Sequence, residues 1–279
     1  MLSYRHAYHA GGPADVLKHA VLAFVLAHAT RKPAPLFVLD THAGAAAYDL
    51  DAAMPAKLAE HAAGIDRVLA AAATAPALLV PYLEVVADGL TTGPGRPYPG
   101  SPELARALLR PGDRLDLVEL HPTDHAALAQ GFARIEGVRV VQGDGLAHLL
   151  RVLPPRERRA VVLIDPSYEI KADYTTVPDA LIRACGRFAH GTFVLWYPVI
   201  ERSRAEDLLA MLAASGVRRQ LVVELCLRPD GARRGMTGFG LVVINPPWTL
   251  PQAAATGLPW LARTLDADGP WRCGWLVPE

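Results

Sequence analysis

Short apolar runs rich in β-branched residues recur along the chain and alternate with stretches of helical spacing. Such runs, bounded by glycine, proline or acids, are typical of strands buried on both faces of a sheet. A helix is expected from Ala14 to about His28, because the turn Gly11-Gly12-Pro13 precedes it and Asp15 lies near its start. The pattern as a whole predicts an α/β fold with seven strands, at Leu36–Asp40, Leu115–Glu119, Val138–Val141, Val161–Ile164, Thr192–Trp196, Leu221–Leu227 and Gly240–Ile244.

The alternation of strands and helices stops between Tyr48 and Pro99. Lys57–Ala73 is rich in alanine with helical spacing, and Pro76 to Leu90 reads as a second helix. We therefore expect an inserted helical subdomain at 49–99, with residues 1–48 and 100–279 forming the main domain. A helical crossover of the parent fold is the alternative interpretation.

Acids stand at the ends of the first four predicted strands. Parallel strands place their carboxyl ends at one edge of the sheet, where open α/β folds bind their ligands. The turn after Asp40 contains only one glycine, Gly44, and lacks the G-x-G-x-x-G of dinucleotide sites, which counts against NAD. S-adenosylmethionine has no pyrophosphate and needs no such close backbone approach. The acids at these strand ends are Asp40, Glu119, Asp144 in the turn Gln142–Gly145, and Asp165. Together they favour a methyltransferase with an adenosine cofactor of that type, in which Glu119 accepts the ribose hydroxyls and Asp144 the adenine amino group.

The stretch Val161–Tyr168 reads Val-Val-Leu-Ile-Asp-Pro-Ser-Tyr, a buried strand followed at once by an acid, a proline and an aromatic. Pro166 cannot continue a central strand, so Asp165 and Tyr168 fall just past its carboxyl end. This resembles the Asp/Asn-Pro-Pro-aromatic signature of enzymes that methylate exocyclic amines of adenine or cytosine. In that chemistry the Asp165 carboxylate and the Pro166 carbonyl accept hydrogen bonds from the two N–H groups of the amine, and Tyr168 stacks on the extruded base. Ser167 departs from the usual second proline.

A second stretch, Asn245-Pro246-Pro247-Trp248, fits that signature better letter for letter. It follows the seventh strand, however, which is antiparallel in methyltransferase sheets and so ends at the edge opposite the cofactor. We interpret Asn245–Trp248 as a structural turn with a packed tryptophan.

Composition narrows the class of protein. Lys and Arg total 28 against 28 Asp and Glu, so any polyanionic partner must be held by local clusters. Three widely spaced cysteines without a CxxC argue against disulfides and structural zinc. His6 and His9 have no carboxylate or cysteine cluster nearby, and no metal is expected. The polar N-terminus has no signal-peptide core, which predicts a cytoplasmic protein. The candidate basic clusters are Arg151 with Arg156, Arg158 and Arg159, Arg218 with Arg219, and Arg233 with Arg234.

Over nearly its full length the chain resembles the RlmJ family, bacterial 23S ribosomal RNA adenine-N6 methyltransferases. The resemblance rests on blocks of sequence that are more specific than the tetrapeptide. They are Met1–His9, Ala14–His19, Leu39–Gly44, Tyr98–Pro102, Glu119–Pro122, Leu195–Pro198, Arg234–Thr237, Asn245–Trp248 and Trp275–Glu279.

The resemblance implies a Rossmann-like, seven-stranded class I fold that depends on S-adenosylmethionine, with the helical insertion in the stretch noted above. Asp165 is implied as the catalytic acceptor, and Tyr4, with Lys18, as a contact to the RNA. The implied cofactor contacts are His19, His42, Ser101, Glu119, Asp144 and Gly145.

The prediction is thus methyl transfer from S-adenosylmethionine to N6 of one adenine in 23S ribosomal RNA by a monomer. The RNA can be naked or part of a pre-ribosomal particle. A DNA adenine methyltransferase with the same site is the alternative within enzymes. A cofactor- and RNA-binding assembly factor with a decayed active site is the alternative from another class, and a dehydrogenase comes third.

Overall fold

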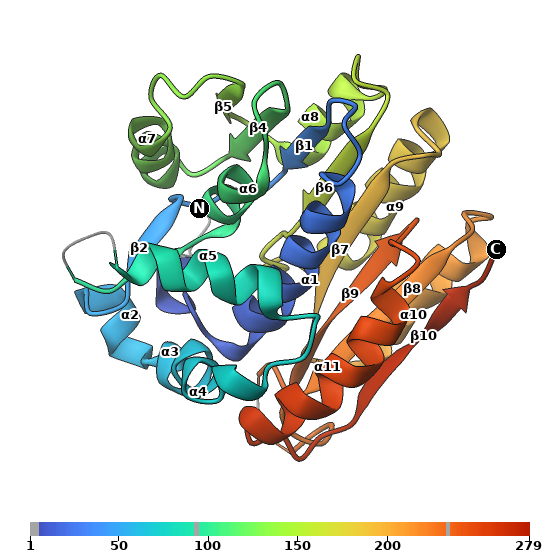
Figure 1. The fold of residues 1–279 in the computed structure, drawn as a ribbon. Helices are drawn as coiled ribbons and strands as arrows, with labels where there is room; N and C mark the ends of the chain where they lie inside the picture. Colours follow the sequence, from blue (N-terminus) through green and yellow to red (C-terminus); the bar gives the residue numbers. More distant parts are fainter. Residues whose placement is uncertain (1–5, 92–94, 233–234) are drawn as a thin grey trace.

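The computed structural model describes residues 6–91, 95–232 and 235–279, and it consists of one large sheet with helices on both faces (Figure 1). The strands lie side by side in the order β10-β8-β9-β7-β6-β1-β4-β5. Their bounds are β1 Phe37–Asp40, β4 Arg114–Glu119, β5 Val138–Gln142, β6 Ala160–Ile164, β7 Thr192–Val199, β8 Gln220–Cys226, β9 Gly238–Ile244 and β10 Trp271–Val277.

The five strands β5, β4, β1, β6 and β7 are parallel neighbours, so their carboxyl ends share one edge of the sheet. Consecutive residues of a strand face opposite sides. Val161 and Leu163 accordingly belong to one core, and Val162 and Ile164 to the other. Burial on both faces explains why these strands read as unbroken apolar runs.

All seven predicted strands are present, and the sheet has an eighth. β9 runs antiparallel between β7 and β8, as the class I interpretation expects, and β10 adds antiparallel to β8 at the edge. The sequence did not predict β10, because this edge strand is only partly buried and mixes Arg272 and Gly274 with its apolar residues.

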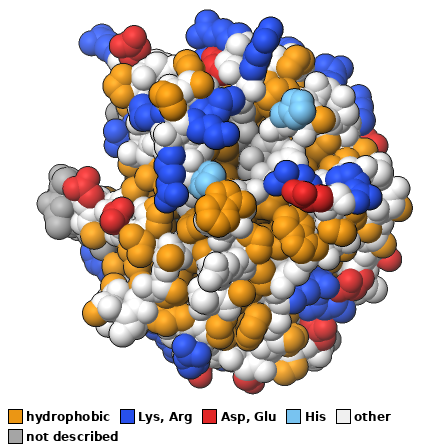
Figure 2. All heavy atoms as spheres, turned by 45° about the vertical axis from the view of Figure 1, so that its right-hand side comes forward, with side chains coloured by type: hydrophobic (Ala, Val, Ile, Leu, Met, Phe, Trp, Pro, Cys, Tyr) orange, Lys and Arg blue, Asp and Glu red, His pale blue; other side chains and the backbone are white. Residues whose placement is uncertain are grey.

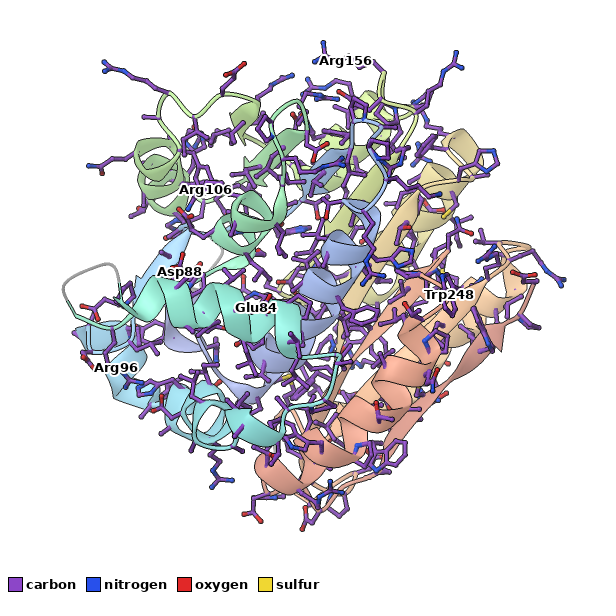
Figure 3. All side chains as sticks on the ribbon, viewed as in Figure 1. Glu84, Asp88, Arg96, Arg106, Arg156 and Trp248 are labelled. Carbon is purple, nitrogen blue, oxygen red and sulfur yellow. The ribbon has the colours of Figure 1, made fainter. Side chains whose placement is uncertain are left out.

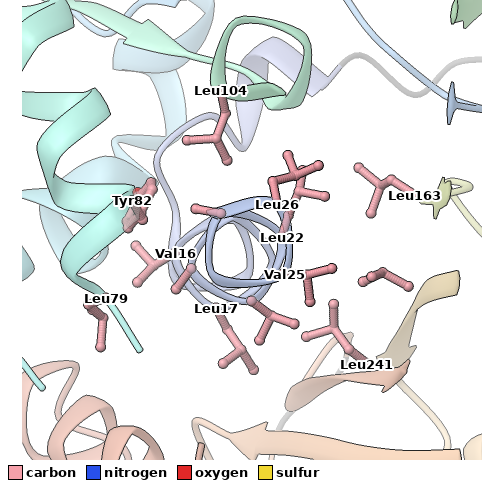
Figure 4. Close-up of a cluster of buried hydrophobic side chains, with 14 of the residues drawn as sticks. Val16, Leu17, Leu22, Val25, Leu26, Leu79, Tyr82, Leu104, Leu163 and Leu241 are labelled. Atoms are coloured by element: carbon pink, nitrogen blue, oxygen red, sulfur yellow. The ribbon is translucent and has the colours of Figure 1, made fainter. Parts of the chain in front are cut away.

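The helix α1, Pro13–Ala29, confirms the predicted N-terminal helix and is buried on nearly all sides. Figure 4 shows it packed between the sheet residues Leu163 and Leu241 on one side and Leu79 and Tyr82 of the insertion on the other. The other main-domain helices are η1 His6–Tyr8, α6 Ser101–Leu108, α7 Pro122–Gly131, α8 Gly145–Val152, α9 Asp173–Arg187, α10 Arg202–Ala214 and α11 Leu250–Thr264.

The segment predicted as an insertion lies between two short paired strands, β2 Ala47–Asp49 and β3 Pro97–Pro99. The expected helix over 57–73 is broken at Ala59, whose backbone is left-handed, and at Gly64, whose φ of −108° and ψ of −106° lie outside the helical region. Only glycine fits at position 64, because a Cβ there would lie 2.1 Å from the carbonyl oxygen of Gly11. The segment shares the core of α1, so its standing as a separate subdomain stays a prediction. Its helices are α2 Ala53–Leu58, α3 Glu60–Ala63, α4 Ile65–Ala70, η2 Ala72–Thr74 and α5 Val80–Thr91.

Candidate active site

A cleft opens where the carboxyl ends of β1, β4, β5 and β6 meet. It brings together most of the residues that the sequence singled out, although they lie up to 148 positions apart. Those that line it are Lys18, His42, Ser101, Glu119, Asp144, Gly145, Asp165 and Pro166.

Asp165 lines this cleft and is bound by a lysine. The Lys18 ammonium donates to Asp165 Oδ2 at 2.6 Å and lies 2.8 Å from Asp15 Oδ1. Asp15 is fixed in turn by His6 at 3.0 Å and by the Gly11 amide at 3.1 Å. Burial raises the pKa of Asp165, and the charge of Lys18 acts against that rise. Lys18 therefore both orients the carboxylate and favours its ionised form.

This arrangement changes the role expected of Lys18. The side chain is only 5% exposed and its charge is shared by two carboxylates, so it is not presented to an RNA phosphate. The sequence did not predict this pairing or the part of Asp15. The only signal for it was an acid and a lysine three positions apart near the start of one helix.

The loop after β6 corrects the prediction for Tyr168. Its ring is buried against Tyr174, with centroids 4.8 Å apart, and its hydroxyl donates to the carbonyl of Trp196 at 3.0 Å. Tyr168 has a φ of +53°, an uncommon conformation for a bulky residue, and its ring packs in the core rather than lining the cleft. Ser167 lines the cleft in its place, together with Ile170.

Glu119, at the end of β4, is oriented by two backbone amides. Its Oε2 accepts from the Gly44 amide at 2.8 Å, and its Oε1 accepts from the His121 amide at 2.6 Å. The carboxylate is thereby tied to the turn after β1 while it lines the cleft. An acid at this position of an adenosine-binding sheet suits the ribose hydroxyls.

Asp144 and Gly145 begin helix α8. Asp144 Oδ1 accepts from the amides of Leu146 and Ala147, which makes it the N-cap of the helix. Gly145 passes so close to the turn after β1 that an added Cβ would lie 1.9 Å from the carbonyl oxygen of Thr41. The glycine is required by this close approach, which closes one wall of the cleft.

Replacing Gly145 by alanine should therefore separate α8 from the turn after β1. We expect Gly145→Ala to lower the free energy of unfolding by about 1–3 kcal/mol, the usual cost of overpacking, and to weaken cofactor binding. Gly143→Ala is the matched control in the same turn, since its Cβ would meet nothing within 4 Å. Urea denaturation of both variants measures the difference. Equal free energies of unfolding would show that the close approach to Thr41 does not require a glycine at position 145.

Asp40, at the end of β1, is a buried carboxylate that is only half satisfied. Oδ1 accepts from the His42 amide at 3.2 Å, whereas Oδ2 has no hydrogen-bond partner within the described part of the chain. Burial raises the pKa of Asp40 to about 6, with a smaller contribution from the charge of Asp165, while the nearby Ser101 hydroxyl acts against the rise. Asp40 does not line the cleft, but its negative charge adds to that of Asp165 and favours a cationic ligand. S-adenosylmethionine carries a sulfonium and an ammonium group.

This raised pKa predicts how stability depends on pH. Because the carboxyl ionises less readily folded than unfolded, the native state loses stability as pH rises from about 4 to about 6. We expect Asp40→Asn to be more stable than the parent above that window, by on the order of 3 kcal/mol, and to bind S-adenosylmethionine more weakly. Thermal unfolding between pH 4 and pH 8 measures the first effect.

Asp113→Asn should have the opposite effect on stability and be less stable than the parent at neutral pH. Although burial alone would raise the pKa of Asp113, hydrogen bonds from Arg110 and the Leu36 amide hold it below the usual value. The loss of those bonds should cost stability at neutral pH. If both variants were destabilised alike at pH 8, the account of Asp40 would be wrong.

Of the remaining predicted site residues, some line the cleft and others do not. His42 lines the cleft, with Nδ1 2.7 Å from Thr41 Oγ1, and burial lowers its pKa to about 4. Ser101 begins α6 and also lines the cleft. His19 is 1% exposed, bonds to the Tyr98 hydroxyl at 2.9 Å and does not line the cleft, so its contact to the cofactor stays a prediction. Tyr4 lies outside the described residues.

The rival tetrapeptide lies away from this cleft. β9 is antiparallel, so Asn245 follows its end at the opposite edge of the sheet, as predicted. The expectation of a packed tryptophan was wrong, because Trp248 is 80% exposed.

The two histidines considered as metal ligands are paired with carboxylates. His6 pairs with Asp15, and His9 pairs with Glu60 at 3.0 Å. Residues 6–91, 95–232 and 235–279 contain no cluster of three or more His, Cys, Asp or Glu side chains that could hold a metal ion. No helix in the same ranges is long and apolar enough to cross a membrane.

A mixed sheet of this order, with acids from three strand ends around one cleft, defines a class I S-adenosylmethionine-dependent methyltransferase. Residues 33–277 match the family model for "Ribosomal RNA large subunit methyltransferase D, RlmJ". The chain therefore belongs to the RlmJ family of methyltransferases.

Individual relatives agree with this membership over the full length. The chain is 43% identical over 281 residues to ribosomal RNA large subunit methyltransferase J of Escherichia coli (strain K12), and all of both chains is covered. It is 42% identical over 282 residues to the protein of the same name from Haemophilus influenzae, again with full coverage. The crystal structure of protein LPL1258 from Legionella pneumophila is 35% identical, with a TM-score of 0.87, covering 96% of this chain and 98% of that one.

Proposed function

We propose that this protein methylates N6 of one adenine in 23S ribosomal RNA, using S-adenosylmethionine. The observation that carries the proposal is the position of Asp165, which follows a central strand directly, lines the cleft and is followed by Pro166. Membership in the RlmJ family supports the ribosomal RNA substrate.

The chemical problem is that the adenine amine is a weak nucleophile, because its lone pair is conjugated with the ring. The Asp165 carboxylate and the Pro166 carbonyl would accept hydrogen bonds from the two N–H groups of the amine and so favour a pyramidal nitrogen. When bound, S-adenosylmethionine supplies the electrophilic methyl group. After transfer the methylated ammonium is acidic, and its proton goes to Asp165 or to water.

The cofactor would be held by the residues that line the opposite part of the cleft. Glu119 would accept the ribose hydroxyls, and Asp144 with Gly145 would border the adenine. Asp40 is buried and does not line the cleft, and its negative charge would favour the cationic methionine end. The residues present thus fit a cationic adenosyl cofactor.

A ribosomal RNA substrate implies that the protein works in the cytoplasm, and we propose that it does so as a monomer.

Competition between RNA and DNA substrates tests the proposed methylation of 23S RNA. Unmethylated 23S RNA should take up methyl groups, and a DNA duplex containing the same sequence should neither be methylated nor inhibit. Methylation of the DNA would favour the DNA enzyme, and cofactor binding without turnover on RNA would favour a decayed assembly factor.

A further inference from the structure

A second hollow lies at the edge of the sheet opposite the catalytic cleft. It is built from the end of α1, the segments that lead into β6, β7 and β8, and the turn that follows β9. β6 has five residues and a strand rises about 3.3 Å per residue, so roughly 16 Å of sheet separates this hollow from Asp165. Nothing in the proposed reaction uses it.

Positive charge surrounds this hollow. Four Lys or Arg side chains and two histidines line it, and among the described lining residues there is no Asp or Glu. In Figure 2, which brings the right-hand side of Figure 1 forward, many Lys and Arg side chains lie on the upper half of the visible face. The residues are Lys32, Arg158, Arg159, Arg219, His28 and His190.

Two of the cations have hydrogen-bond or ion-pair partners, and the other two are exposed without an ion pair among the described residues. Arg159 donates to the carbonyls of Ala29 and Ala34, and Arg219 lies 3.2 Å from a carboxylate oxygen of Glu279. Lys32 and Arg158 are exposed and form no ion pair within the described part of the chain. The hollow therefore keeps cations available for an anionic ligand.

Trp248 stands at the rim of the hollow, beside the start of α11 (Figure 3). With 80% of its surface exposed, it is the most exposed of the large apolar side chains described. An aromatic ring this exposed, at the rim of a hollow lined by cations, offers a face on which a base can stack.

The turn that carries Trp248 is fixed. The Asn245 side-chain amide donates to the carbonyls of Ala189 and Gly191, both at 2.8 Å, and the Asn245 carbonyl accepts from Thr192 Oγ1 at 3.0 Å. Pro246 and Pro247 are buried and restrict the backbone. The ring is thus presented from a rigid support, which lowers the entropic cost of stacking a ligand on it.

We propose that this hollow is a second RNA site, in which Trp248 stacks on an unpaired base of the substrate and the cations hold the flanking phosphates. Cations around an aromatic platform suit single-stranded nucleic acid, because every base has a face to stack and every nucleotide has a charge. The inference rests on the proposed function, since it assigns the site to the same RNA. Being remote from Asp165, the site holds a part of the RNA other than the target adenine and contributes affinity, not chemistry.

The test compares Trp248→Ala, Trp248→Phe and the control Trp271→Ala, which removes a half-exposed tryptophan of β10. With an unmethylated 23S RNA transcript, Trp248→Ala should raise Kd and KM about tenfold, with kcat and cofactor affinity unchanged. Trp248→Phe should recover most of the affinity, and Trp271→Ala should match the parent. RNA should quench tryptophan emission in the parent and less in Trp248→Phe.

The cations are tested through salt dependence. Lys32→Ser and Arg158→Ser should each lower the slope of log Kd against log salt by about 1. Unchanged Kd and KM in Trp248→Ala would overturn the proposal. So would a defect seen only when ribosomal proteins are present, which would identify a protein partner. RNA binding is measured without cofactor, so it decides this question even if the parent methylates no RNA and the proposed function fails.

Discussion

Asp165→Asn should lower kcat for methyl transfer to RNA by about 10²–10³-fold, the usual cost of removing one group that stabilises the transition state. The amide keeps the shape of the side chain but replaces an anionic acceptor with a mixture of donor and acceptor. The cofactor is expected to bind with nearly the parent affinity, because the other acids of the cleft are untouched. Single-turnover methylation of 23S RNA measures the rate, and calorimetry measures cofactor affinity.

The matched control removes a carboxylate that faces solvent. Asp179→Asn changes an exposed acid of α9 that pairs with Arg183 at 3.7 Å, and it should leave the rate unchanged. If Asp165→Asn retained the parent rate while Asp179→Asn did the same, the catalytic role of Asp165 would be excluded.

Lys18→Met should have the largest effect on the fold, because it leaves Asp15 and Asp165 without the cation they share. Removing one partner of a buried ion pair costs about 3–5 kcal/mol, which denaturant unfolding will measure. Since the lysine charge counters the rise in the pKa of Asp165, that pKa should rise further in the variant. The acid limb of the pH–rate profile should then move to higher pH.

The shift of the pH profile separates positioning from simple loss of stability. Lys171→Met removes an exposed lysine and should leave the free energy of unfolding unchanged. A Lys18→Met variant that is destabilised but keeps the parent pH profile would show that the lysine supports the fold without acting on Asp165.

The sequence predicted the part of the site that lies on buried parallel strands. Asp40, Glu119 and Asp165 each follow an apolar run at once, so their position at one edge of the sheet follows from strand geometry. The same reasoning correctly placed Asn245 at the opposite edge, because it depended on strand direction and not on the letters of the motif.

What the sequence did not predict depends on contacts between distant segments. Lys18 reads locally as an exposed cation, and only folding brings it to Asp165, 147 positions away. The tetrapeptide defines the residue type of Tyr168 but not its left-handed backbone, which turns the ring into the core. Helical spacing over 57–73 is real, yet the backbone leaves the helical conformation at Ala59 and again at Gly64, which packs closely against Gly11.

The most direct test of the function is to identify the methylated nucleoside. Purified protein is incubated with radiolabelled S-adenosylmethionine and unmethylated 23S RNA, which is then digested and separated. The proposed chemistry at Asp165 and Pro166 predicts label in N6-methyladenosine alone. Label in any other nucleoside, or no label although the cofactor binds, would contradict it.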